Sequence, residues 1–218
     1  MKPIPQSGAT VQSFVPEYWN IESRVDGDLD GNGTLDSVIV IWDTTKKNVA
    51  EEVEASNALG SDGSLQDGNR GLLVLLKGTD GRYKLAGFGK NTLLCLRCYG
   101  MMFNPGGGEP DIKIKDHVII INQFSFDDEN AGARSDTFRF RYEKVQNRIR
   151  LIGADFDYTI RPECAREVTS INYLTNTKIT RSTVCKVNPK GPSDSTRKEK
   201  IDPTVWYLEN YIYLRNDE

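Results

Sequence analysis

The chain has 218 residues, a length that one all-β domain can reach, and a formal net charge of −3. Its 28 basic and 31 acidic residues nearly cancel, which argues against nucleic acid as a partner because phosphate binding requires a basic excess. The longest apolar runs are strand-sized, well below the roughly 20 residues needed to cross a bilayer, so no membrane span is predicted.

The N-terminal residues 1–13 are predicted to be a lead-in to the folded part of the chain. Residues 1–8 lack the apolar core and the cleavage site of a signal peptide, so either the protein stays inside the cell or its leader lies outside this chain. A short helical turn is expected at residues 16–19. Residues 14–186 are predicted to form one all-β domain.

An acidic loop at residues 28–36 carries the clearest chemical signal in the chain. Numbered from Asp28, side-chain oxygens fall at positions 1, 3, 5 and 9, Gly33 is at position 6 and the carbonyl of Thr34 is at position 7. Calcium prefers six to eight oxygen ligands, which alternate residues of a tightly turned loop can direct inward. We therefore predict a structural Ca²⁺ site with these ligands: Asp28, Asp30, Asn32, Thr34 and Asp36.

Three other interpretations of this loop compete with this ligand set. An EF-hand requires a glutamate at position 12, where Ile39 lies in an apolar run and cannot bind the ion. A frame that begins at Asp26 offers only Thr34 and Ser37 at positions 9 and 12. A solvated aspartate and glycine turn before a strand needs no ion, and it is the alternative to calcium binding.

Alternation of apolar and polar residues dominates the rest of the chain and predicts antiparallel strands. Phe138, Phe140 and Tyr142 alternate with charged residues, and residues 146–147 separate them from a second alternating segment, which predicts a hairpin. The other predicted strands are residues 37–42, 72–77, 83–88, 111–115, 117–124, 167–173 and 178–184. The best helical pattern is at residues 49–59. The predicted fold class is all-β: a single antiparallel domain, β-propeller-like or sandwich, with few short helices.

Four cysteines bear on the cellular compartment. Cys164 and Cys185 flank a hairpin predicted to turn at residues 175–177, where a disulfide forms if their Cα atoms lie within about 7 Å. Cys95 and Cys98 have the spacing of a metal or redox pair, but no second Cys/His pair completes a zinc site. Three roles of these cysteines stay open: structural disulfides, buried thiols and redox chemistry. Structural disulfides would favour an oxidising compartment.

The last part of the chain changes composition twice. Residues 187–203 are rich in glycine, proline, serine and charged residues and are predicted to be a mobile connection. Residues 204–218 return to an aromatic-rich pattern and are predicted to be a strand that closes the sheet.

The sequence carries no catalytic motif, so the protein is predicted not to be an enzyme. The only histidine, His117, lies in a predicted strand without a serine or cysteine partner motif and is interpreted as structural. Residues 127–129 could pair with another acid for glycosidase chemistry, but they are interpreted as an acidic turn. Asp155 and Asp157 share a strand face, where they are interpreted as partners of nearby arginines.

The order of several segments resembles the successive blocks of a bacterial family of exported FG-GAP-like proteins. The segments are residues 14–19, the calcium loop, and residues 70–76, 93–100, 138–142, 151–153 and 170–175, and the resemblance covers roughly residues 14–182. The family is related to a periplasmic calcium-binding immunity protein, which inhibits a lysozyme-like toxin. The resemblance implies a periplasmic or secreted, non-catalytic inhibitor whose partner is a muramidase-type toxin.

The chain departs from this family pattern at residues 101–110, a loop of its own. Its tip is the predicted partner-binding segment, because a small acidic loop can closely approach a cationic enzyme: Gly106, Gly107, Gly108 and Glu109. An ordinary hairpin connection is the alternative for this loop. The alternative function is a surface module that binds a glycan or another protein through aromatics such as Trp206 and Tyr211.

Overall fold

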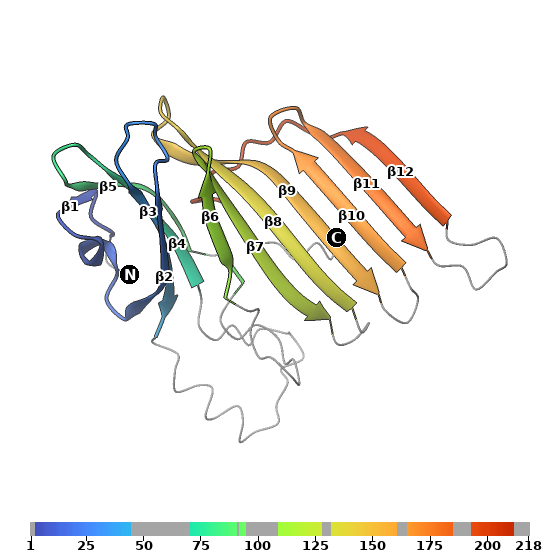
Figure 1. Cartoon of the computed structure of the whole chain (residues 1–218), viewed down its shortest axis with the longest axis horizontal. Coiled ribbons are helices and arrows are strands. Elements are labelled where there is room, and N and C mark those ends of the chain that lie inside the picture. The colour runs from blue at the N-terminus through green and yellow to red at the C-terminus, as the bar shows by residue number, and fades with distance from the viewer. Residues whose placement is uncertain are drawn as a thin grey trace, which may run out of the picture.

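The computed structural model of the chain describes residues 3–44, 70–90, 92–94, 109–127, 132–160, 165–184 and 193–211. These residues form two antiparallel sheets, which confirms the predicted all-β class in its sandwich-like form (Figure 1). In the described ranges, no helix is long and apolar enough to cross a membrane. The predicted helix at residues 49–59, the four cysteines and Gly106, Gly107 and Gly108 lie outside these ranges.

The five-stranded sheet has the strand order β1-β5-β4-β3-β2. Its strands are β1 (Ser7–Gly8), β2 (Trp19–Gly27), β3 (Asp36–Asp43), β4 (Arg70–Lys77) and β5 (Tyr83–Gly89). Strands β3 and β4 are central and are covered on both faces, so their apolar residues run continuously instead of alternating. This sheet contributes to two separate hydrophobic clusters, one on each face.

The N-terminal segment covers the outer face of the five-stranded sheet. Strand β1 pairs with β5, and the 3-10 helix η1 (Val11–Phe14) places Val11 and Phe14 in the cluster that contains Ile39 and Leu73. The predicted lead-in at residues 1–13 is therefore wrong for the described residues, because an apolar outer face has to be covered. The helix lies at Val11–Phe14, whereas the helical turn predicted at residues 16–19 is a turn closed by the Trp19 amide on the Pro16 carbonyl, at 3.1 Å.

The seven-stranded sheet has the strand order β12-β11-β10-β9-β8-β7-β6. Its strands are β6 (Asp111–Lys115), β7 (Val118–Asp127), β8 (Gly132–Glu143), β9 (Arg148–Ile160), β10 (Ala165–Asn172), β11 (Thr177–Val184) and β12 (Ser193–Lys200). The predicted hairpin around residues 146–147 is present, since Phe140 pairs with Leu151 and Tyr142 with Ile149. The hairpin predicted to turn near residues 175–177 is present as β10 and β11.

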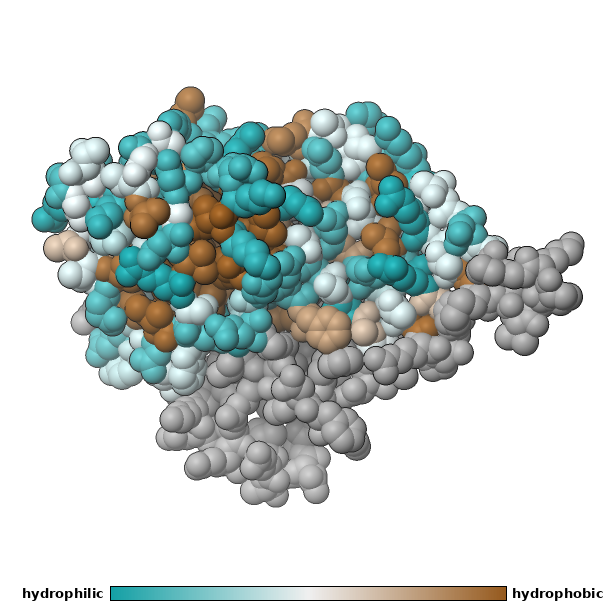
Figure 2. All heavy atoms as spheres, in the orientation of Figure 1, coloured by the Kyte–Doolittle hydropathy of each residue, from teal (hydrophilic) through white to brown (hydrophobic). Residues whose placement is uncertain are grey.

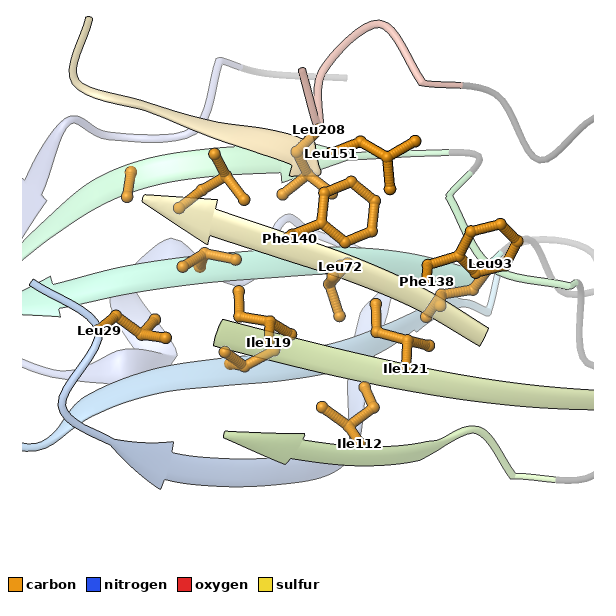
Figure 3. Close-up of a cluster of buried hydrophobic side chains, with 14 of the residues drawn as sticks. Leu29, Leu72, Leu93, Ile112, Ile119, Ile121, Phe138, Phe140, Leu151 and Leu208 are labelled. Carbon is orange, nitrogen blue, oxygen red and sulfur yellow. The ribbon is translucent and has the colours of Figure 1, made fainter. Parts of the chain in front are cut away.

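The main core lies between the two sheets (Figure 3). Ile119, Ile121, Phe138 and Phe140 of β7 and β8 are fully buried against residues of β3 and β4 such as Leu72. Their polar neighbours in sequence face outward, so the period-two pattern of these strands reflects burial on one face only. Leu29, from the loop between β2 and β3, belongs to this core as well.

Strands β10, β11 and β12 extend beyond the five-stranded sheet (Figure 1). No described side chain of these three strands is buried. The same region of the surface is mostly hydrophilic, whereas hydrophobic residues gather over the other half of the molecule (Figure 2). The sheet thus has a sandwiched part and an uncovered part.

The C-terminal part of the chain differs from its prediction in two places. The mobile connection predicted at residues 187–203 contains β12, which pairs with β11 along its whole length. Of the strand predicted at residues 204–218, the described residues make only one bridge, between Tyr207 and Arg150. Their aromatic rings pack on the core instead, because Trp206 and Tyr211 fill the margin between the sheets beside the buried Leu208.

A buried ion pair ties β2 to β4 across the central strand β3. Glu22 lies at the bulge of β2, and its carboxylate accepts a hydrogen bond of 2.7 Å from Nε of Arg70, whose side chain is 3% exposed. Replacing Glu22 with alanine removes one hydrogen-bonding partner of a buried guanidinium, and we expect the free energy of unfolding to fall by about 2 kcal/mol. Urea denaturation measures the change. The control is Arg166→Ala, which removes an exposed ion pair and is expected to cost at most about 1 kcal/mol; equal losses would contradict the prediction.

Candidate metal centre

The loop between β2 and β3 closes around the carboxylate of Asp28. Its two oxygens accept hydrogen bonds from the amides of Gly31, at 2.7 Å, and Gly33, at 3.1 Å. Gly31 and Gly33 have φ angles of 74° and 80°, a backbone region that favours glycine. The two glycines therefore allow the turn that folds the acidic residues back on one another.

Three of the predicted ligands come together at this loop. One carboxylate oxygen from each of Asp28, Asp30 and Asp36 lies within 4.8 Å of the others. Two oxygens bound to one calcium ion at 2.3 to 2.6 Å lie at most about 5 Å apart, so the three groups fit a shared ion. Asp26, the first residue of the competing frame, instead accepts hydrogen bonds from Arg24 and Ser37, each at 2.7 Å.

Asp36 is the buried member of the cluster. Its side chain is fully buried, and its oxygens accept hydrogen bonds from the amides of Leu29, at 2.7 Å, and Lys77, at 2.8 Å. Burial raises the pKa of Asp36, and the charges of Asp30 and Asp28 raise it further, while the two amides act against the rise. A cation at this position would offset the repulsion among the three carboxylates.

Asp28 responds differently to the same surroundings. Burial acts to raise its pKa, but the amides of Gly33 and Gly31, the charge of His117 and the amide of Asn32 together leave the pKa below its ordinary value. The loop thus favours the ionised form of Asp28, which is the form that binds a metal ion.

The two remaining predicted ligands face the end of β4. Asn32 Nδ2 donates a hydrogen bond of 3.2 Å to the carbonyl of Lys77, and the Thr34 hydroxyl also contacts that carbonyl. Asn32 Oδ1 accepts hydrogen bonds from the amide and the hydroxyl of Thr34, both at 2.6 Å. The structure thus joins the three carboxylates in one cluster, with Asn32 and Thr34 as the link to β4.

The loop is in contact with both sheets. Leu29 is 3% exposed and lies at one end of the core between the sheets (Figure 3). His117 Nδ1 donates a hydrogen bond of 2.8 Å to the carbonyl of Asp28. His117 is in the turn before β7, with a φ angle of 62°, so the prediction that it lies in a strand is wrong. The turn between β6 and β7 therefore holds the loop from the second sheet.

Sequence reasoning missed the groups that hold the loop in place. Lys77 contributes through its backbone amide and carbonyl, which no side-chain pattern reveals. His117 is far from the loop in sequence, and its turn comes near because β6 lies against β2 in the fold. Leu29 was the one detectable residue, as an apolar position among the acidic ones.

The other acidic residues considered as functional candidates are engaged elsewhere. Asp155 forms an ion pair of 2.7 Å with Arg139, and Asp157 forms one of 2.6 Å with Arg166, as their shared strand face suggested. Asp127 ends β7, whereas residues 128–129 are outside the described ranges. Glu109, the one described residue of the predicted partner-binding segment, is exposed just before β6.

The fold and the loop define a two-sheet, all-β protein with an acidic cluster where its sheets meet. Comparisons with protein families, with curated proteins and with solved structures found no match to the chain.

Proposed function

We propose that the protein is a calcium-binding module that acts by binding another protein, not by catalysis. The observation that carries the calcium part is the meeting of three carboxylates, from Asp28, Asp30 and Asp36, within 4.8 Å at one loop. These are hard oxygen ligands without a nitrogen or sulfur donor among them, which suits calcium better than zinc or copper. The ion adds charge compensation that the loop's own hydrogen bonds do not supply.

The proposed role of the ion is structural. The loop follows an edge strand of one sheet, contacts the end of β4 through Lys77 and contacts the second sheet through His117. An ion that binds only this folded arrangement stabilises it by mass action. Asp28, Asp30 and Asp36 would hold the ion, together with oxygens of Asn32 and Thr34.

Isothermal titration calorimetry of chelator-treated protein tests the calcium site. We expect saturable heat on addition of Ca²⁺, with a dissociation constant of about 10⁻⁴ to 10⁻³ M, as in extracellular modules. We also expect a rise of several degrees in melting temperature at saturating Ca²⁺. Magnesium at the same concentration is the control, since it demands a smaller octahedral site. The absence of both heat and a thermal shift would refute the site.

We propose further that the protein is exported and inhibits a muramidase-type toxin. This part derives from the resemblance to exported FG-GAP-like proteins. The engagement of Asp155 and Asp157 in ion pairs supports a binding role, because a glycosidase requires two carboxylates free to act on one substrate bond. The partner-binding segment proposed for this role is Gly106, Gly107, Gly108 and Glu109.

A cell-wall lysis assay tests the inhibitor role. Calcium-loaded protein is titrated into muramidases, including toxins encoded beside its gene, and we expect one of them to lose activity in stoichiometric proportion. A variant in which residues 106–109 become Ser-Ser-Ser-Ser should lose inhibition while it keeps its calcium heat and its melting temperature. Full inhibition by that variant would remove the segment's role, and no inhibition of any muramidase by the unaltered protein would refute the proposal.

The alternative is a surface module that binds a glycan or another protein through aromatics such as Trp206 and Tyr211. The Tyr211 ring lies 5.4 Å from that of Phe138 and 5.9 Å from that of Phe140, and Trp206 packs on Tyr211 at 6.4 Å. The rings of Trp206 and Tyr211 are both half-buried at the margin of the core, which leaves less of their surface for contact with a sugar ring. We therefore do not extend the proposal to glycans.

A further inference from the structure

The outer edge of the seven-stranded sheet is a hydrophilic strand eight residues long. β12 pairs with β11 on one side, and no described residue pairs with its other side. All of its side chains are exposed except that of Glu199, which is half-buried. It lies at the end of the sheet farthest from the five-stranded sheet (Figure 1).

The described contacts stabilise β12 only weakly. Its side chains take no part in either hydrophobic cluster. Glu199 forms exposed ion pairs with Arg197 and Lys178, and exposed pairs contribute little to stability. A strand of this kind, with an unpaired row of backbone amides and carbonyls, is a template for one more strand.

We propose that β12 pairs with β12 of a second copy of this chain. The two strands run antiparallel about a two-fold axis that is perpendicular to the sheet and passes midway between the two copies of Thr196. The axis places Thr196 opposite Thr196, and Asp194 opposite Lys198 on both sides of it. The pairing joins the two seven-stranded sheets into one continuous sheet.

The charge pattern of β12 selects this register. Antiparallel partners point to the same face of a sheet, so a symmetric pair must be centred on a residue and not between two. Centres at Arg197, Lys198 or Glu199 place that charged residue opposite its own copy, which is unfavourable. A centre at Ser195 pairs only residues 193–197 of the strand, whereas the centre at Thr196 pairs residues 193–199 without opposing like charges.

Asp194 and Lys198 are available for this contact. Both side chains are exposed, and among the described residues neither has an ionic partner. A partner strand that complements β12 needs a basic residue opposite Asp194 and an acidic residue opposite Lys198. Because the partner runs antiparallel, these two residues must follow one another in the opposite order along its chain. β12 itself satisfies that requirement, which is why a second copy fits better than a strand of unrelated sequence.

Sedimentation velocity of the full chain over a range of concentrations tests the proposal. We expect a reversible monomer–dimer equilibrium. Asp194→Lys and Lys198→Asp each create two like-charge contacts in a symmetric dimer, so each variant alone should dimerise at least about tenfold more weakly. An equimolar mixture of the two variants places opposite charges across the edge again and should restore the dimer.

A control variant outside the proposed interface tests whether the effect is specific to β12. Lys84→Asp makes the same charge change as Lys198→Asp on the exposed face of β5, in the other sheet, and should leave the dimer unchanged. Melting curves verify that each variant is folded. A monomer at every concentration overturns the proposal, as does a dimer that is indifferent to both edge variants. Failure of the mixture to recover the dimer overturns the pairing about Thr196.

Discussion

Replacement of Leu29 with alanine is expected to lower the free energy of unfolding by about 3 kcal/mol and to weaken calcium binding at the same time. Leu29 is 3% exposed in the core between the sheets, so truncation leaves a cavity there. Its amide also donates to Asp36 at 2.7 Å, so a shift of the Leu29 backbone displaces a proposed ligand. Urea denaturation with chelator present gives the first effect, and calorimetry with Ca²⁺ gives the second.

Leu35 offers a matched control in the same loop. Its side chain is 62% exposed. Leu35→Ala therefore deletes the same side-chain atoms as Leu29→Ala, but at a position in contact with solvent. We expect a change below about 0.5 kcal/mol and unaltered calcium binding. Similar losses in the two variants would contradict the assignment of Leu29 as the residue that fastens the loop to the core.

Replacement of Asp36 with asparagine is expected to abolish calcium binding and to cost about 2 kcal/mol of stability even with chelator present. The buried carboxylate accepts one amide hydrogen bond on each oxygen, from Leu29 and from Lys77. An asparagine side chain keeps one acceptor, so one of these two amides loses its partner. The substitution also removes a negative charge from the proposed ligand set. Urea denaturation and calorimetry measure the two effects separately.

Asp30→Asn separates metal binding from folding. Asp30 is half-buried, and within the described part of the chain its carboxylate accepts hydrogen bonds only from Asn32, at 3.0 and 3.1 Å. Its replacement should weaken calcium binding while it changes the stability of the chelator-treated protein by less than about 1 kcal/mol. Wild-type calcium affinity in both Asp36→Asn and Asp30→Asn would contradict the metal centre, whatever their stabilities.

Strands such as β7 and β8 could be predicted because they have one face in the core and one in water. Phe138 and Phe140 alternate with Arg139 and Arg141, and that alternation records the face on which each residue lies. β12 gave no such signal, since its residues are polar on both faces and its strand conformation comes only from backbone pairing with β11. From its composition alone, the segment that contains β12 was therefore predicted to be a mobile connection.

The C-terminal segment shows the opposite error. Trp206 and Tyr211 have the composition of a strand, but their rings are used to fill the margin of the core, and Tyr207 makes a single bridge. Aromatic residues are enriched both in strands and in core packing, and sequence does not distinguish the two uses. The acidic loop was predictable because side-chain spacing and glycine placement are local. Its attachment to Lys77 and His117 depends on contacts between distant segments.

The order of strands within the two sheets has a consequence for how the chain folds. From β2 to β5, and again from β6 to β12, each strand pairs with its neighbour in the chain. Most of these pairings join strands that follow one another closely in the chain, which costs little loop-closure entropy, so we expect the docking of the two halves to be the slow step. The hydrogen bond between His117 and Asp28 arises only in that step. An ion bound at the loop that this hydrogen bond holds would slow unfolding far more than it speeds folding. It would therefore lower the rate at which the two halves separate.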